Sequence, residues 1–436
     1  MQLNRKVLAA SIIGGVLEVY DFIVYGLMAS TIAPIFFNPE DTFSSLIQSY
    51  IAFCVGFLAR PFGAIIFGYL GDFFGRKKAL ILSALLMSFS TLAIGILPTY
   101  EMIGVWASLS VFIIRILQGI SVGGEYTGGI ILAIEHTPQG KRGAVGSYVV
   151  AGYMGGVFLG SLASFLFTLP FMPSWGWRLP FIFGFLIVGV GIYVRKKVQE
   201  SPEFKALKKS SRSSILQDFL KAPTVFLSCM GIAGFSGIFL YTLTVYIPTY
   251  LKNNFLLSKS TTMFIPVLPT LCMVIGIIIF GTLSDKWGRL TLMKIGALST
   301  TILVFPLVYL LNGGTFATGL LALVSIAFLA SIFMGPMNTL IVEIFNPSHR
   351  YRSAAISYSL GMSLFGGTAP LIAAWLIKLS EGPFLLSCYF FLGGLMGWVA
   401  VSLVGAHLRK KSSPNNEPFS YRLELSPEAF PLHKET

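Results

Sequence analysis

The chain has 436 residues, of which 55% are hydrophobic and only 11% carry a charge. Soluble proteins carry about 25% charged residues, so this composition excludes a globular protein that faces water on all sides. The formal net charge is +13. We attribute this charge to basic loops on one side of a membrane rather than to nucleic-acid binding, because membrane proteins concentrate Lys and Arg in their cytoplasmic loops.

Twelve apolar stretches are long enough to cross a bilayer as helices, which takes about 20 residues each. The first, residues 8–36, follows only Arg5 and Lys6 and lacks an A-x-A-like cleavage site, so we expect a retained helix and not a signal peptide. The other spans are residues 46–70, 79–98, 102–133, 143–169, 179–195, 222–250, 262–283, 291–311, 316–344, 353–378 and 384–407.

The distribution of basic residues predicts the topology. With the N-terminus inside, four of the 31 Lys and Arg residues face outside and two lie within spans, so the rest fall on cytoplasmic segments. This asymmetry is what the positive-inside rule predicts. We therefore expect a multi-pass protein with both termini in the cytoplasm. The outward-facing residues are Arg178, Lys252, Lys259 and Lys378.

Two phrases occur twice, about half the chain apart. "GYLGDFFGRKKAL" (68–80) matches "GTLSDKWGRLTLM" (281–293), and "EHTPQGKR" (135–142) matches "EIFNPSHR" (343–350). Paired repeats of this kind predict two parallel six-helix halves. We place the halves at residues 1–197 and 222–408, a polar linker at 198–221 and a tail, expected to be disordered, at 409–436.

Several motifs then resemble a known family. The phrase around Asp72 and "RILQGISVGGE" (115–125) resemble motifs of the major facilitator superfamily. "LEVYDFIVYG" (17–26), "RPFGAIIFGYLGD" (60–72), "GWRLPF" (176–181) and "ESPEF" (200–204) resemble its metabolite:proton symporter family. Val19, Phe73 and Ser359 depart from the usual pattern. The resemblance implies an all-α fold of twelve transmembrane helices in two pseudo-symmetric halves.

The resemblance also implies a function. Carriers for proline/betaine, α-ketoglutarate, shikimate and citrate belong to this family, so we expect a monomer in a bacterial-type inner membrane that takes up a small polar metabolite with protons. A proton-antiport exporter on the same fold and a non-transporting sensor are the alternatives. The four cysteines have no metal-ligand spacing and no catalytic constellation is evident, so we expect no enzyme activity, no metal and no cofactor besides the coupling proton.

Charges within the spans indicate where coupling takes place. Each of Glu18, Asp21, Arg60, Arg115 and Glu125 would cost about 2.5–3.5 kcal/mol at mid-bilayer if it faced lipid. They must instead face a cavity or one another, either as a static paired network or as a functional site. Three acids face two bases, so one acid lacks a fixed partner and can carry a proton. Asp21 is our leading candidate, with Glu18 and Glu125 as alternates.

Candidate substrate-binding residues come from both halves. Arg60 and Arg115 could bind a carboxylate, and Tyr25 continues the helix face of Glu18 and Asp21. The second half offers polar side chains that could line a cavity or serve only in helix packing: Tyr241, Tyr246, Asn338 and Tyr358.

The repeated phrases predict a breakable contact on the cytoplasmic face. Each half places its span 2–3 turn and its span 4–5 turn on that face, so their charges can cluster. We expect one cluster of Asp72, Arg76, Glu135 and Arg142, and a counterpart of Asp285, Arg289, Glu343 and Arg350. The simpler interpretation is that these charges only fix topology.

Overall fold

In the computed structural model, the chain is helical with short connections over the residues that the structure describes. These are residues 5–38, 41–74, 76–123, 126–135, 137–186, 219, 222–313, 315–345, 350–380 and 382–411. The predicted linker, apart from Phe219, and the tail beyond Lys411 lie outside these ranges. The predicted domain boundaries therefore remain predictions.

Among the helices of the first half, α3 (Thr42–Leu58) begins at a side-chain cap. The Asp41 carboxylate accepts hydrogen bonds from the backbone N–H groups of Phe43 (3.0 Å) and Ser44 (3.1 Å) and so caps one helix. The elements are α1 (Arg5–Leu27), α2 (Ala29–Phe36), α3 (Thr42–Leu58), α4 (Arg60–Phe74), α5 (Arg76–Ile96), α6 (Tyr100–Ile103), α7 (Val105–Val122), α8 (Tyr126–Glu135), η1 (Gln139–Lys141), α9 (Arg142–Leu166), η2 (Gly176–Arg178) and a helix over 179–186.

Two spans of the second half contain a π-helical segment that the sequence analysis did not predict. The segments are η4 (Thr242–Tyr246) and η5 (Met362–Gly367). Such segments are rare and are frequent at functional sites. The other elements are α13 (Pro223–Tyr241), α14 (Ile247–Phe255), α15 (Lys259–Phe264), α16 (Val267–Trp287), α17 (Arg289–Gly313), α18 (Phe316–Ile344), α19 (Arg350–Gly361), α20 (Ala369–Ser380) and α21 (Phe384–Lys411).

The described helices are consistent with twelve spans. Nine of them are long and apolar enough to cross a membrane, and α1 with α2 forms a tenth span that is bent by 64°. The apolar helix over Ile81–Ile96 falls short of the usual length. The helix over 179–186 is the described part of the remaining predicted span.

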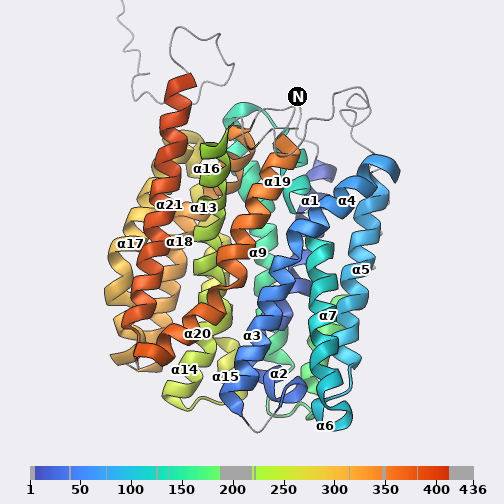
Figure 1. Cartoon of the computed structure of the whole chain (residues 1–436). Coiled ribbons are helices and arrows are strands. Elements are labelled where there is room, and N and C mark those ends of the chain that lie inside the picture. The colour runs from blue at the N-terminus through green and yellow to red at the C-terminus, as the bar shows by residue number, and fades with distance from the viewer. Residues whose placement is uncertain are drawn as a thin grey trace, which may run out of the picture.

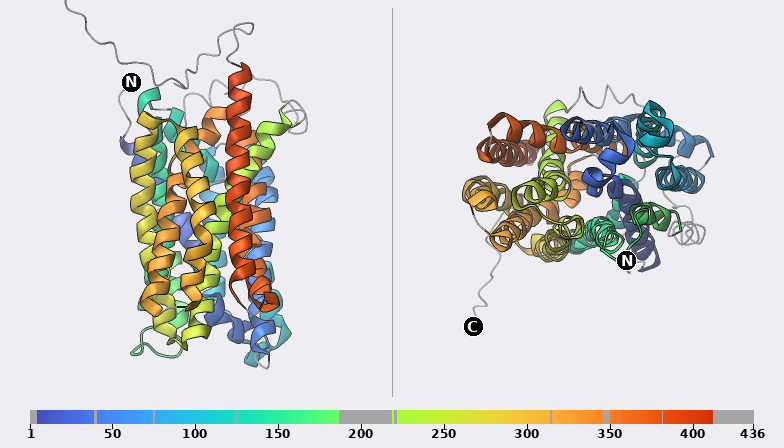
Figure 2. Two further views of the ribbon diagram at one scale, coloured as in Figure 1. Left: turned by 90° about the vertical axis from the view of Figure 1, so that its left-hand side faces the viewer. Right: turned by 90° about the horizontal axis from the view of Figure 1, so that it is seen from below.

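The two sets of helices lie side by side, with α9 and α16 in contact between them (Figure 2). Helix α9 also packs closely on α1, because a Cβ atom at Gly156 would overlap the Val16 carbonyl oxygen. A small residue at this position therefore allows the two helices to approach closely. The first residue of α1 and the last of α21 lie at the same end of the molecule (Figure 1), as an even number of spans requires.

Candidate functional site

A small cavity lies between the two halves near the middle of the helices. Its volume is about 30 Å³, room for one or two water molecules. It is too small for an amino acid, so the helices must part before a solute of that size can occupy it. Its polar lining comes from α1, α4, α9, α13 and α19, namely Glu18, Arg60, Tyr153, Ser236, Tyr241 and Tyr358.

Charge and aromatic rings are brought together in this cavity. Arg60, the first residue of α4, is 4% exposed, and its guanidinium carbon lies 5.2 Å from the ring centre of Phe57 and 5.8 Å from that of Phe22. Glu18 contributes a carboxyl group to the same cavity. The site can therefore offer a cation, an anion and aromatic faces to one ligand.

Arg115 lies one layer behind the cavity and is completely buried. Its Nη1 donates to the Phe22 backbone oxygen (3.1 Å) and to Gln118 Oε1 (2.7 Å). Its guanidinium also stacks on the rings of Phe22 (4.5 Å) and Tyr25 (4.6 Å). Arg115 therefore holds the middle of α1 against α7, and it does not line the cavity.

A chain of polar contacts leads from Arg115 towards the backbone of Asp21. Gln118 Nε2 donates to Thr91 Oγ1 (2.9 Å), and the single proton of that hydroxyl is shared between the backbone oxygens of Met87 (3.0 Å) and Asp21 (3.4 Å). The carboxyl group of Asp21 is itself buried, with Oδ1 packed where a Cβ of Gly184 would lie. Within the described part of the chain, neither of its oxygens has a hydrogen-bond partner.

The predicted coupling acids thus occupy different places. Glu18 lines the cavity, whereas Asp21 faces the helix over 179–186. Positions three apart on a helix point about 60° apart, and here that offset separates a cavity position from a packed one. Glu125 lies outside the described residues.

Among the predicted substrate residues, Arg60, Tyr241 and Tyr358 line the cavity. Tyr25 and Arg115 form the layer behind it, and Tyr246 packs on Tyr50 of α3 at 6.3 Å between ring centres. Asn338 is buried in α18 beside Met337, which does line the cavity. The sequence analysis missed other lining residues: Phe22, Tyr153, Ser236, Met334 and Met337. Phe22 could have been found, because it lies one turn beyond Glu18 on the same helix.

The predicted charged cluster of the second half forms, and it reaches into the first half. Asp285 pairs with Arg289 (2.8 Å), whose Nε lies 3.4 Å from Glu343 Oε2. The Asp285 carboxylate also accepts hydrogen bonds from the backbone N–H groups of Gly143 and Ala144, both at 2.9 Å. It therefore caps the N-terminus of α9. We call these contacts of Asp285, Arg289 and Glu343 the near seam, because they lie at the end of the molecule that holds both ends of the described chain, which we call the near face.

The other two described charges of the predicted clusters both interact with Glu343. Arg350 interacts electrostatically with this carboxylate within its own predicted cluster, and its Nε donates to the Phe345 backbone oxygen (3.3 Å). Arg142 interacts electrostatically with Glu343 from the first half, whereas the sequence predicts a cluster of Arg142 with charges of its own half. The side chains of Asp72, Arg76 and Glu135 lie outside the described part of the structure.

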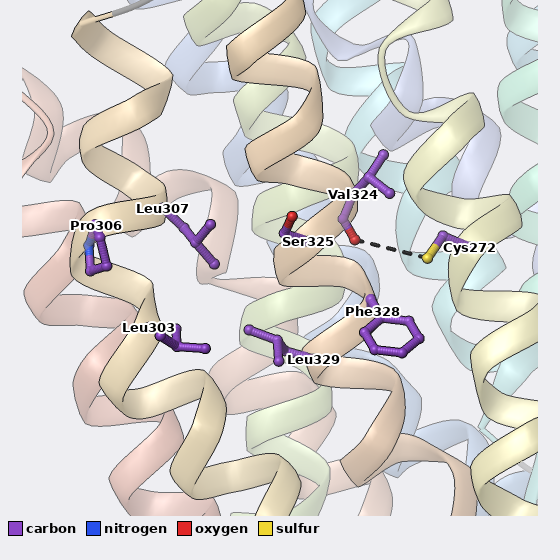
Figure 3. A pocket seen from close by; sticks show the side chains of 8 residues that line it. All are labelled: Cys272, Leu303, Pro306, Leu307, Val324, Ser325, Phe328 and Leu329. Carbon is purple, nitrogen blue, oxygen red and sulfur yellow. Dashed lines mark hydrogen bonds between the residues drawn. The ribbon is translucent and has the colours of Figure 1, made fainter.

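A larger groove of about 460 Å³ lies away from this site, between α16, α17 and α18 (Figure 3). Leu303 and Phe328 line it and are 42% and 43% exposed, as expected of side chains that face lipid. The Cys272 thiol donates to the Val324 backbone oxygen (3.8 Å) across one edge. The described residues that line this groove include no charged side chain, so it is a poor site for a polar solute.

Comparisons with known proteins agree on one family. A family profile described as Major Facilitator Superfamily matches residues 21–360 and 242–429. The proline/betaine transporter of Escherichia coli is 31% identical over 412 residues, which is 91% of this chain and 82% of that protein. A glycine betaine/proline/ectoine/pipecolic acid transporter of Dickeya dadantii is 32% identical over 411 residues, 90% of this chain and 81% of that protein.

A solved structure supports the same fold. The crystal structure of a D-xylose–proton symporter superposes with a TM-score of 0.71 and 19% identity, covering 92% of this chain and 97% of that one. The twelve-span architecture expected from the sequence agrees with this likeness. The chain belongs to the major facilitator superfamily, and it is accordingly a membrane transporter and not an enzyme.

Proposed function

We propose that this chain takes up a zwitterion of the proline or betaine type together with protons. The observation that carries the proposal is the cavity, where the Arg60 guanidinium suits a carboxylate while Glu18 and the aromatic rings suit a cationic nitrogen. Relatives named as proline/betaine transporters support it. A dicarboxylate fits less well, because Arg60 is the one basic side chain that lines the cavity among the described residues.

Transport in proteoliposomes tests this proposal. With an imposed inward proton gradient, labelled proline or glycine betaine should accumulate, and a protonophore should abolish the accumulation. α-Ketoglutarate should accumulate far less. Preferential uptake of α-ketoglutarate would overturn the zwitterion assignment, and accumulation only when the proton gradient is reversed would favour the exporter.

We further propose that Asp21 carries the coupling proton. An ionised carboxylate is costly to bury without a partner, and proton binding removes that cost. Two buried guanidinium atoms of Arg115, Nε and Nη2, also lack hydrogen-bond partners within the described residues. Arg115 therefore keeps hydrogen-bonding capacity in the same half as Asp21, although these two nitrogens lie against Gly56 of α3 while the Asp21 carboxyl lies against Gly184. Glu18 remains the alternate from within the cavity.

We also propose that the near seam is a gate. The hydrogen bonds of Asp285 to the backbone of α9 join the two halves at the end of the molecule that holds both ends of the described chain. The ion pair with Arg289, within the second half, holds that carboxylate in place. By the sequence repeat, Asp72, Arg76, Glu135 and Arg142 would form a matching contact. The excess of Lys and Arg on the segments at this end supports a cytoplasmic position for it, and we propose that the protein acts as a monomer.

A further inference from the structure

The two halves also meet on the side away from the chain ends, through aromatic side chains. Tyr50, Phe53 and Phe57 of α3 follow one another at spacings of three and four residues, on one helix face, and all are fully buried. They face Tyr241 and Tyr246 of the other half, and Tyr50 donates from its hydroxyl to Thr249 Oγ1 (3.3 Å). We call these contacts the far seam, and the end of the molecule away from the chain ends the far face.

Phe57 has the most extensive contacts in the far seam. Its ring lies 4.8 Å from that of Tyr241 and 5.0 Å from that of Phe53. On the other side it packs against Gly367 of η5, where a Cβ atom would overlap it. Its backbone oxygen accepts a hydrogen bond from Ser363, also of η5. Ser363 and Gly367 of the π-helical segment thus form a packing site for Phe57, which we call the socket.

Phe57 lies directly behind two residues that line the cavity. The Arg60 guanidinium stacks on its ring, and its other neighbour, Tyr241, lines the cavity as well. Because α3 and α4 run from the far end towards the chain ends, Phe57 lies about one turn on the far side of Arg60. It therefore packs behind the cavity wall on the side of the far end.

We propose that Phe57, which packs in the socket of Gly367 and Ser363 of η5, is the gate residue that closes the cavity towards the far face. Arg60 couples this packing to the bound solute. A carboxylate that binds Arg60 competes with the ring of Phe57 for the guanidinium, so solute binding weakens the packing of Phe57 in the socket. The coupling step rests on the proposed zwitterion function, whereas the gate itself does not.

The gate is tested by thiol labelling of a reporter in the cavity. Ser236→Cys is introduced into a chain whose four native cysteines are replaced by alanine. A membrane-impermeant maleimide is then applied to either face of oriented vesicles, without substrate. Phe57→Ala should raise the labelling rate from the far face roughly tenfold, the effect of losing one good aromatic pair, and leave the rate from the near face unchanged.

Two further variants make this result decisive. Phe62→Ala is the matched control, because this phenylalanine of α4 is 65% exposed, and its labelling rate should equal that of the parent. Gly367→Ala places a methyl group in the socket and should act like Phe57→Ala, even if the latter does not fold. Unchanged labelling in Gly367→Ala, or an equal increase in Phe62→Ala, would overturn the gate.

A second reporter tests the coupling to solute. Thr249→Cys lies in the far seam, so glycine betaine should speed its labelling in the parent but not in Phe57→Ala. If betaine is transported and leaves this rate unchanged, the coupling is wrong. If no zwitterion is transported at all, the proposed substrate is wrong, while the gate is still judged from the rates without substrate.

Discussion

At the scale of single residues, the two buried arginines differ in what surrounds them. Arg60 opens onto the cavity beside Glu18, whereas Arg115 is fixed by two hydrogen bonds and two rings. The sequence predicted that both would be sheltered from lipid, which is correct. It could not rank them, because both arginines lie within apolar spans and look alike in the sequence.

Replacing each arginine by lysine should separate these roles. Lysine keeps the charge but loses the planar fork. Arg60→Lys should raise the KM for a zwitterion roughly tenfold, the scale of one charge-assisted hydrogen bond. Arg115→Lys should lower kcat more than it raises KM, because the substitution weakens the packing of α1 against α7 and residue 115 does not line the cavity. Initial uptake rates over a range of solute concentrations measure both, and a larger KM effect from Arg115→Lys would contradict the assignment.

Asp21→Asn should uncouple transport from the proton gradient. The amide keeps the shape of the buried carboxyl but cannot release a proton, so accumulation should be lost while solute exchange across the membrane persists. Asp41→Asn is a matched control, because asparagine caps a helix as well as aspartate does. Accumulation that survives in Asp21→Asn would move the coupling role to Glu18 or Glu125.

At the scale of helices, the near seam depends on one carboxylate. Asp285→Ala removes the cap from α9 and the partner of Arg289, so it should open the near seam without unfolding the bundle. A cysteine in place of Ser147, which packs against Gly281 in this interface, should then label about tenfold faster from the near face.

Lys286→Ala, the exposed neighbour of Asp285, is the control and should leave this rate unchanged. If Asp285→Ala labels no faster and transports normally, the repeated motif serves only topology. By the repeat, Asp72→Asn should have a similar effect to Asp285→Ala.

The helices themselves were predictable to different degrees. The long apolar stretches predicted nearly all the spans, because a helix that crosses the bilayer core needs about 20 apolar residues in succession. The bend between α1 and α2 and the π-helical segments η4 and η5 were not predicted. For η5 a tertiary contact accompanies the change in geometry, since Phe57 of α3, which is distant in sequence, packs against it. The sequence analysis also missed the contact of Asp285 with α9. A sequence repeat predicts one cluster of charges within each half, and it does not predict contacts between the halves.

At the scale of the whole molecule, the closed cavity implies that the two halves move against each other. Cysteines at Tyr50 and Thr249, whose native side chains touch across the far seam, would lie too far apart for a direct disulfide once the tyrosine ring is removed. A short bifunctional methanethiosulfonate reagent that joins them should block transport until it is reduced. The same reagent applied to cysteines at Ser83 and Ser121, which are in contact within the first half, should leave transport intact. Transport through the cross-linked Tyr50–Thr249 pair would contradict a movement of the two halves against each other.

The cap on α9 has a consequence for the order of events. When the near seam parts, the N–H groups of Gly143 and Ala144 lose the carboxylate that satisfies them, and the carboxylate loses two donors. Buried groups of this kind are costly to leave unpaired, so water must replace the lost partners as the gap widens. Separation and hydration are then a single step, and the same water offers protons a route to the interior each time this end opens.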